Sequence, residues 1–200
     1  MSLNKAIVLI VLVLLIDQIS KIYIKTHFVL YEGVEVFSWF KIYFIENEGM
    51  AWGAKIPGQY GKLALTLFRL LAIVGIGYWL WDSARKKMPS VLIVSIALIF
   101  AGAFGNIIDS VFYGIIFNDS TSQVASFFPS EGGYGTLFHG KVVDMFSFSF
   151  FDPVFNVADS SISIGVALLI LFNKKAFPKK EKEEVKEESV STSDTTSTEV

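Results

Sequence analysis

The sequence predicts a mainly α-helical membrane protein with four transmembrane helices and a small outward-facing β-sheet and loop region at the membrane surface. Three observations predict this class. The 200 residues are 52% hydrophobic, and their mean hydropathy of +0.53 is too high for an ordinary soluble domain of this size. Four apolar runs approach the roughly 20 residues that cross a bilayer. Basic residues flank alternate ends of those runs.

The predicted helices occupy about residues 6–24, 63–81, 91–112 and 155–172. The first is not a cleavable signal peptide, because it carries Asp17 and Lys21 and no small-x-small cleavage site follows it. We therefore expect it to remain as an anchor. Residues 1–176 form one membrane domain, and the charged, Ser- and Thr-rich stretch 177–200 is predicted to be a disordered tail.

The positions of the basic residues predict the orientation. They lie before the first run, between the second and third, and after the fourth: Lys5, Arg85, Lys86, Lys87, Lys174, Lys175, Lys179 and Lys180. By the positive-inside rule, both termini and the tail face the cytoplasm. The long connections, 25–62 and 113–154, then face outward.

Both outward connections contain strand-like patterns. The first includes "VEVFSWFKIYFIENEGMAWG", which partly alternates and predicts a short sheet, although a plain amphipathic loop is the alternative. The second ends in "VVDMFSFSFFDP", which alternates in the same way. The aromatic residues of the first connection suit the interfacial belt: Trp39, Tyr43, Phe44 and Trp52.

The composition excludes several kinds of chemistry. There is no cysteine, so thiol nucleophiles, disulfides and cysteine-bound metals are excluded. The two histidines, His27 and His139, are far apart and stand in no metal-ligand spacing. We expect no metal, no cofactor and no nucleic-acid partner.

Carboxylates gather near the outer ends of the predicted helices. With the orientation above, Asp17, Asp109 and Asp159 come to a similar depth at about 1.5 Å rise per residue, and Asp144 lies in the outward segment that immediately precedes the last helix. A single intramembrane charge can mark packing alone, whereas several at one level indicate a shared, water-accessible site. The clustering favours a functional site over a purely structural one.

Lys21 and Arg69 are the two basic residues within the outer halves of the predicted helices. Asp17 and Lys21 are four residues apart on one helical face, and a structural ion pair is the favoured interpretation. Arg69, in the outer half of the second helix, either pairs with a site carboxylate or extends its side chain outward, and the second alternative is slightly favoured.

An amide precedes a carboxylate by three residues in two places. Asn106 stands before Asp109 in "GNIID", and Asn156 stands before Asp159 in "FNVAD", where Ala158 is adjacent. At this helical spacing the amide can orient the carboxylate or bind a peptide backbone.

Asp144 lies among apolar residues in "VVDMF", which should raise its pKa by desolvation. If Asp144 and Asp159 approach within a few ångströms, they should share a proton, because both cannot ionise easily. One carboxylate could then take a proton from water while the other, protonated, donates to a scissile carbonyl. This is the chemistry of an aspartic protease.

Five segments, in this order, resemble bacterial lipoprotein signal peptidase, also called signal peptidase II. They are "DQISK", "NEGMAWG", "GNIID", "VVDMF" and "FNVADSSI", and they cover nearly all of the membrane domain. The resemblance implies an intramembrane aspartyl endopeptidase that removes signal peptides from prolipoproteins, cutting before a diacylglyceryl-modified cysteine. It also implies a location in the bacterial inner membrane with the active site facing the outer side, contact with membrane lipid, and inhibition by cyclic peptides of the globomycin type. A monomer would suffice, because one chain carries both acids.

The resemblance places the catalytic dyad on Asp144 and Asp159. It places the supporting residues at Asp17, Lys21, Asn47, Gly49, Asn106, Asp109, Asn156 and Ala158. Two departures stand out. Ser110 occupies a position where many members have arginine, and we hypothesise that Arg69 takes over part of that role. The stretch 118–140 is expanded, and we expect a lid or a substrate-guiding loop there.

Two other classes compete with a peptidase. Intramembrane carboxylates also serve as relays in small transporters or proton channels. That alternative requires a continuous polar path, whereas the inner helix halves, such as "IVLIVLVLL" and "VALLILF", are apolar. The other alternative is an assembly protein with a buried polar cluster.

Overall fold

The structure is a computed structural model that describes residues 1–48 and 61–178. Four residues named above, Gly49, Trp52, Lys179 and Lys180, lie outside the described residues, as does the predicted tail from residue 179 onward. The helices are α1 (Leu3–His27), α2 (Gly61–Arg85), α3 (Ser90–Ile108), the π-helix η2 (Asp109–Tyr113), α4 (Gly114–Ile116), α5 (Val157–Leu171) and α6 (Asn173–Ala176).

Three helical stretches are long and apolar enough to cross a membrane. They are α1, α2 and the continuous stretch Ser90–Ile116, with 25, 25 and 27 residues. The fourth predicted span is shorter, because α5 has only 15 residues, roughly 22 Å at about 1.5 Å per residue. It begins later than expected because Phe155 is the last residue of a strand and Asn156 caps the helix.

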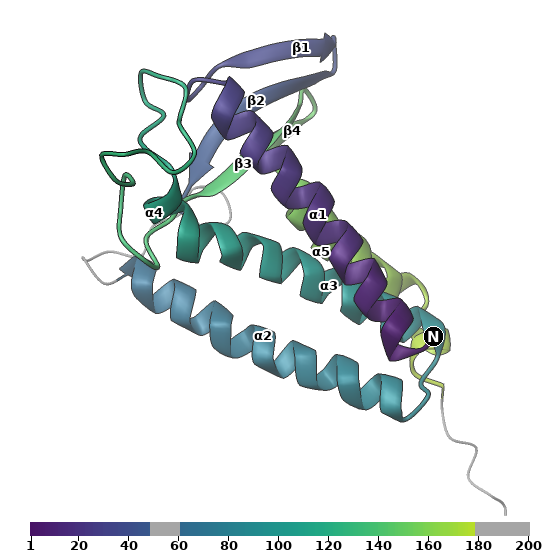
Figure 1. Ribbon diagram of the computed structural model, residues 1–200. Coiled ribbons are helices and arrows are strands. Elements are labelled where there is room, and N and C mark those ends of the chain that lie inside the picture. Colours follow the sequence, from purple (N-terminus) through teal and green to yellow (C-terminus); the bar gives the residue numbers. More distant parts are fainter. Residues whose placement is uncertain (49–60, 179–200) are drawn as a thin grey trace, which may run out of the picture.

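The third helix is the centre of the bundle (Figure 1), since α1, α2 and α5 all pack against it. Small residues bring α3 and α5 very close. A Cβ atom added at Gly102 would lie 2.2 Å from the carbonyl oxygen of Ala158, and one added at Gly165 would lie 2.7 Å from that of Ser95. This close approach places the start of α5 beside the C-terminal part of α3.

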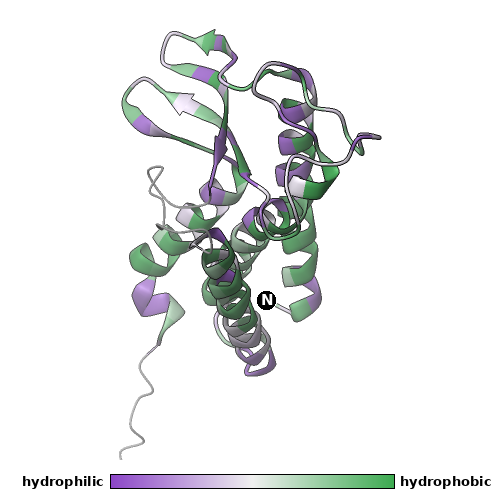
Figure 2. Ribbon diagram, turned by 90° about the vertical axis from the view of Figure 1, so that its left-hand side faces the viewer, coloured by the Kyte–Doolittle hydropathy of each residue, from purple (hydrophilic) through white to green (hydrophobic). Residues whose placement is uncertain are grey.

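Four antiparallel strands form one sheet in the order β1-β2-β3-β4. They are β1 (Gly33–Phe37), β2 (Phe40–Asn47), β3 (Val142–Phe148) and β4 (Phe151–Phe155). The two connections predicted to carry strands therefore build a single sheet beyond one end of the helices (Figure 1). Figure 2 shows mostly hydrophobic helices and a sheet of mixed hydropathy.

One aromatic residue differs from its predicted place at the membrane interface. Trp39 is half exposed, as an interfacial residue would be, and it stacks on Phe37 and Phe148. Phe44 is instead fully buried, in a cluster with Tyr113 and Phe117. The reason is that its side chain faces α1 and the helix end, so the sheet covers it.

The expanded segment 118–140 lies against the C-terminal end of the third helical stretch. A helix end leaves backbone carbonyls without intrahelical partners. The segment supplies donors for them in four bonds, from the N–H groups of Phe128, Gly135, Phe138 and Gly140 to the carbonyls of Ile116, Gly114, Val111 and Ser110, at 2.8, 2.8, 3.0 and 2.9 Å. The segment therefore caps the helix end.

The third helix also changes its winding at this end. An α-helix was expected to continue to residue 112, but Asp109–Tyr113 forms a π-helix. Gly140 packs so closely here that an added Cβ atom would lie 2.0 Å from the carbonyl oxygen of Asp109. A π-turn is a short irregularity within an α-helix. The hydrophobic pattern of the sequence, which predicts only that a helix continues, therefore did not predict this one.

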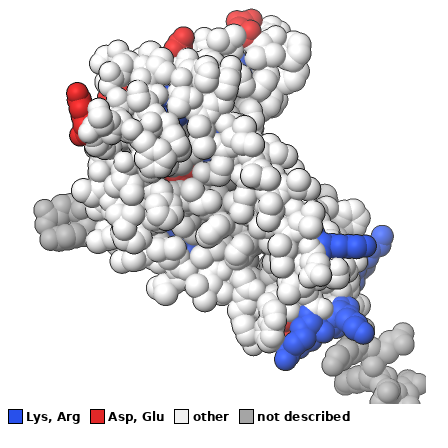
Figure 3. All heavy atoms as spheres, viewed as in Figure 1, with Lys and Arg blue, Asp and Glu red and all other residues white. Residues whose placement is uncertain are grey.

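Charged side chains gather at opposite ends of the molecule. Figure 3 shows Lys and Arg at the end farthest from the sheet, and Asp and Glu on the surface near the sheet. The helix ends and links on the basic side carry exposed Lys5, Arg85, Lys86, Lys174 and Lys175.

We expect Gly102→Ala to destabilise the fold by about 1–3 kcal/mol, because the new methyl group overlaps the backbone of α5. Gly75→Ala is the matched control, since an added Cβ atom there meets nothing within 4 Å, and it should be neutral or slightly stabilising. Thermal unfolding in detergent measures both. Equal melting temperatures for the two variants would contradict the close packing.

Candidate active site

The predicted dyad residues line one cavity. Asp144 lies on β3 with only 1% of its surface exposed, and Asp159 lies half-buried in the first turn of α5. The cavity has a volume of about 590 Å³. Its described lining also includes the polar residues Asn47, Arg69 and Asn106, and on α5 the apolar residues Ile162 and Ile164. None of these described lining residues belongs to segment 118–140, so the lid or substrate-guiding role expected there stays a prediction.

Amide side chains link the two carboxylates. Asn156 Nδ2 donates to Asp144 Oδ1 at 2.7 Å, and Asn106 Nδ2 donates to Asp159 Oδ1 at 2.8 Å. The two amides also meet each other, since Asn156 Nδ2 lies 3.2 Å from Asn106 Oδ1. On the other side, Asn47 Nδ2 donates to Asp144 Oδ2 at 3.1 Å. The predicted amides therefore orient carboxylates, but not the ones that their spacing indicated: Asn106 donates to Asp159 where Asp109 was expected, and Asn156 donates to Asp144 where Asp159 was expected. Asn47 orients Asp144 as well.

The local sequence explains how Asp159 is held. Asn156 is the N-cap of α5, and its Oδ1 accepts the backbone N–H of Asp159 at 2.9 Å. The Asp159 carboxylate accepts the backbone N–H of Asn156 in return, at 3.3 Å. This reciprocal pair is a capping box, which requires the three-residue spacing seen in the sequence.

Asp144 lies on the sheet, outside the membrane-spanning helices. Burial raises the pKa of its carboxyl to about 7, and the nearby charge of Asp159 contributes to the rise. Hydrogen bonds from Asn47 and Asn156 and the charge of Lys21 act in the opposite direction. Desolvation is thus the main cause, as its apolar neighbours predicted.

A second polar layer lies beneath the dyad, around Lys21. Its ammonium lies 2.9 Å from Asp17 Oδ2, 2.9 Å from Asp109 Oδ2 and 2.9 Å from Asn106 Oδ1. The side chain is fully buried. The predicted Asp17–Lys21 pair therefore forms, but as part of a triad that joins two helices.

Each carboxylate of the triad holds the backbone next to a dyad residue. Asp17 Oδ1 accepts the N–H of Ala158 at 2.9 Å, and Ala158 directly precedes Asp159. Asp109 Oδ2 accepts the N–H of Val143 at 3.3 Å, and Val143 directly precedes Asp144. The buried layer thus fixes the positions of β3, which carries Asp144, and of α5, which carries Asp159.

Two residues of this layer were not singled out in the sequence. Gln18 Nε2 donates to Asp17 Oδ2 at 3.0 Å and to Asp109 Oδ1 at 2.9 Å, and Tyr113 donates to Gln18 Oε1 at 3.2 Å. The available signals were weak. Gln18 is adjacent to Asp17, and Tyr113 follows Asp109 by four residues.

Arg69 contacts the residue that occupies the usual arginine position. Its Nη1 lies 3.4 Å from Ser110 Oγ, and its side chain lines the dyad cavity. The carboxylates of Asp159, Asp109 and Asp144 all attract its charge. The side chain therefore lies at the site, not outward as slightly favoured from sequence.

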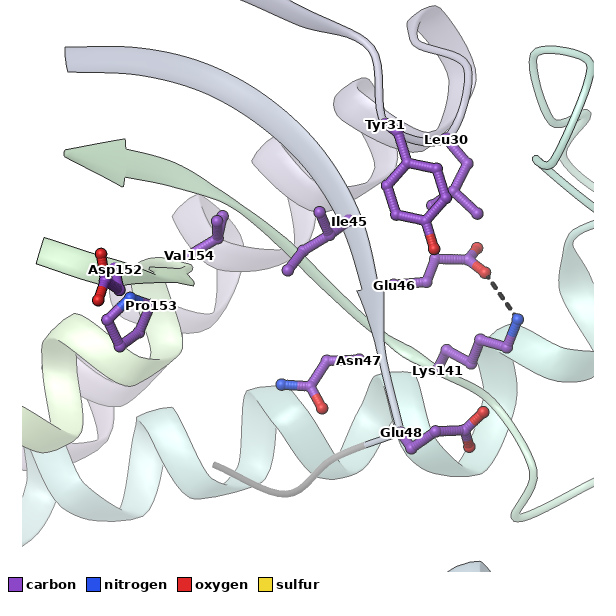
Figure 4. Close-up of a pocket in the computed structure, with 10 residues that line it drawn as sticks. All are labelled: Leu30, Tyr31, Ile45, Glu46, Asn47, Glu48, Lys141, Asp152, Pro153 and Val154. Atoms are coloured by element: carbon purple, nitrogen blue, oxygen red, sulfur yellow. Dashed lines mark hydrogen bonds and ion pairs between the residues drawn. The ribbon is translucent and has the colours of Figure 1, made fainter. Parts of the chain in front are cut away.

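A second cavity adjoins the first. Its volume is about 540 Å³, and it shares Asn47, Pro153 and Val154 with the dyad cavity. Figure 4 shows its charged wall, where Glu46 and Lys141 form an ion pair of 3.1 Å. Within residues 1–48 and 61–178, no group of three or more His, Cys, Asp or Glu side chains could hold a metal ion.

Comparison with solved structures defines the class. Two structures of bacterial membrane enzymes match the chain with TM-scores of 0.64 and 0.63, at 30% and 27% identity. The first match covers 90% of this chain and 94% of that structure, and the second covers 88% and 96%. The fold is thus that of a bacterial membrane enzyme.

Sequence comparison identifies the family. The family model described as signal peptidase (SPase) II matches residues 9–174. A lipoprotein signal peptidase of Porphyromonas gingivalis is 46% identical over 82% of this chain and 80% of its own length. One from Staphylococcus aureus is 31% identical, over 90% and 94%. The chain belongs to the signal peptidase II family, and it is a membrane peptidase.

We expect Lys21→Met to destabilise the protein by about 3–5 kcal/mol, because it leaves the carboxylates of Asp17 and Asp109 buried without their cation. Lys62→Met is the control. It breaks the Lys62–Glu48 pair, whose side chains are 14% and 37% exposed, and should cost less than about 1 kcal/mol. Denaturation in mixed micelles measures both changes. A small, equal loss would contradict the role of the triad.

Proposed function

We propose that this protein is an aspartyl endopeptidase that removes the signal peptide from diacylglyceryl-modified prolipoproteins, cutting before the lipidated cysteine. The observation that carries the proposal is the pair Asp144 and Asp159, which line one cavity and are linked through two amides. Family membership supports the substrate class.

The hydrolysis requires one acid and one base. Asp159 takes a proton from water, whose oxygen attacks the scissile carbonyl carbon, while protonated Asp144 donates its proton to the carbonyl oxygen. The tetrahedral intermediate then collapses. Asp144 recovers a proton from one hydroxyl, Asp159 gives its proton to the leaving nitrogen, and the C–N bond breaks. The two carboxyl groups end in their starting states.

The surroundings of each carboxyl group support this assignment of roles. The raised pKa of Asp144 keeps a protonated fraction near neutral pH. Asp159 accepts an amide N–H from Asn106 and a backbone N–H from Asn156, which suits an ionised acceptor. The side chain of Arg69 at the cavity wall is placed to interact with the substrate backbone or with the developing charge.

The membrane position follows from the charge distribution. The exposed basic end faces the cytoplasm by the positive-inside rule, so the sheet and the dyad face the outer side. The apolar cavity wall on α5 can then hold a lipid-anchored peptide in the outer leaflet without moving its acyl chains into water. A cyclic peptide inhibitor of the globomycin type would occupy the same cavity. Each monomer would act alone.

The first test compares cleavage of a purified diacylglyceryl-prolipoprotein by wild type, Asp144→Asn and Asp159→Asn. Each substitution should lower kcat by roughly 1,000-fold or more, which is the size of loss expected when an essential acid or base is removed. Asp152→Asn, on an exposed carboxylate of the adjoining cavity, should cleave like wild type. Folded dyad variants that still cleave would refute the assignment, and an inactive wild type would refute the function.

The second test is the pH dependence. Because the acid must be protonated and its pKa is raised to about 7, kcat/KM should fall about tenfold per pH unit above that value. Initial rates from pH 5 to 9 measure the effect, after the substrate and the enzyme have been shown to stay intact at each pH. A rate that is flat or rising from pH 7 to 9 would assign the acid elsewhere.

A further inference from the structure

Glu46 joins three parts of the fold beside the site. Its carboxylate pairs with Lys25 of α1 and, at 3.1 Å, with Lys141, which directly precedes β3. Lys25 is fully buried and also donates to Ser120 Oγ at 2.9 Å. Three rings surround its ammonium, those of Phe44, Phe117 and Tyr134, with centroids at 5.8, 5.4 and 4.9 Å.

The neighbour of Glu46 on the strand is Asn47, whose amide donates to Asp144 Oδ2. Successive side chains of a strand point to opposite faces. Figure 4 shows this alternation, with Glu46 and Lys141 on one side of β2 and Asn47 on the other. The Glu46 ion pairs on one face of β2 therefore lie directly behind the Asn47 amide on the other face.

The register of this strand pair needs such a constraint. Glu46 pairs with Val143 and Asn47 pairs with Val142, but the register of β2 against β3 shifts between Ile42 and Ile45. A slip of one residue would exchange the two faces of the strand. Asn47 would then point away from Asp144, while Glu46 would enter the dyad cavity.

We propose that Glu46, held by Lys25 and Lys141, is a positioning residue of the peptidase that fixes the register of β2 and so directs the Asn47 amide to Asp144. Buried ion pairs are weak sources of stability, and register selection is their best-attested use. The proposal rests on the proposed function only in that it treats Asp144 as the acid.

A double-mutant cycle on cleavage tests whether Glu46 acts through Asn47. Glu46→Gln and Asn47→Ala should each lower kcat about 5- to 20-fold with little change in KM, and the double variant should lose no more than Asn47→Ala alone. Glu48→Gln is the matched control on the same segment and should keep wild-type kcat. Additive losses, or full activity of a folded Glu46→Gln variant, would overturn the proposal.

A titration supplies a test that does not need turnover. The Asn47 hydrogen bond lowers the pKa of Asp144, so losing it should raise that pKa. Removing the Glu46 charge without moving Asn47 would instead lower it. The other charged groups acting on Asp144, namely Asp159 and Lys21, with Arg69 at the cavity, stay unchanged.

Infrared difference spectra of the carboxyl band measure the pKa of Asp144, with Asp144→Asn as the reference that identifies its band. The comparison of Glu46→Gln with wild type then shows whether that pKa has risen or fallen. A raised pKa supports positioning, and a lowered or unchanged pKa overturns it. If Glu46→Gln does not fold, Lys25→Met takes its place in the cleavage cycle, because it removes the α1 contact and leaves the Glu46–Lys141 pair. If wild type never cleaves but the titration shows a raised Asp144 pKa in Glu46→Gln, the proposed function is refuted and the positioning role of Glu46 is not.

Discussion

The buried ammonium of Lys21 is the interaction on which the site depends. One cation contacts two carboxylates and an amide at 2.9 Å each, with no solvent exposure. Burying these charges separately would cost several kcal/mol each, so the three groups are stable only together. Since Lys21 belongs to α1 and Asp109 begins η2, the cluster fixes one helix against another, and its carboxylates then bind the backbones of α5 and β3.

The dyad layer is organised differently, and the difference suits hydrolysis. Asp144 and Asp159 are held by amides and backbone N–H groups, which orient a carboxylate without neutralising it as an ammonium would. A lysine at 2.9 Å from Asp144 would keep that group ionised and remove the acid. The structure therefore places its cation one layer lower, where it supports the geometry and leaves the protonation of the proposed dyad to be set mainly by burial.

Local spacing made much of this site predictable, and tertiary pairing made the rest unpredictable. The Asp17–Lys21 pair follows from the helical period of four, and the Asn156–Asp159 spacing is that of a capping box. The carboxylates to which the Asn106 and Asn156 amides donate, Asp159 and Asp144, lie on other segments and were not predicted by the spacing. The hydrophobic runs and alternating segments likewise predicted the helices and the sheet. By contrast, the Val143–Asp109 bond, the position of Gln18, the burial of Phe44 and the π-turn at Asp109 arise only when distant segments meet. The place of segment 118–140 at a helix end has the same origin.

Two lysines one turn apart on α1 connect the whole arrangement. Lys21 reaches Asp109, which holds the N–H of Val143 on β3, while Lys25 reaches Glu46 on β2. The strands that carry Asp144 and Asn47 are thus both attached to α1, through two lysines that are four residues apart. The expanded segment takes part through Ser120, which contacts Lys25, and through the N–H groups that cap the end of α4 and η2. These attachments tie the segment both to the end of the third helix and to the buried ammonium of Lys25.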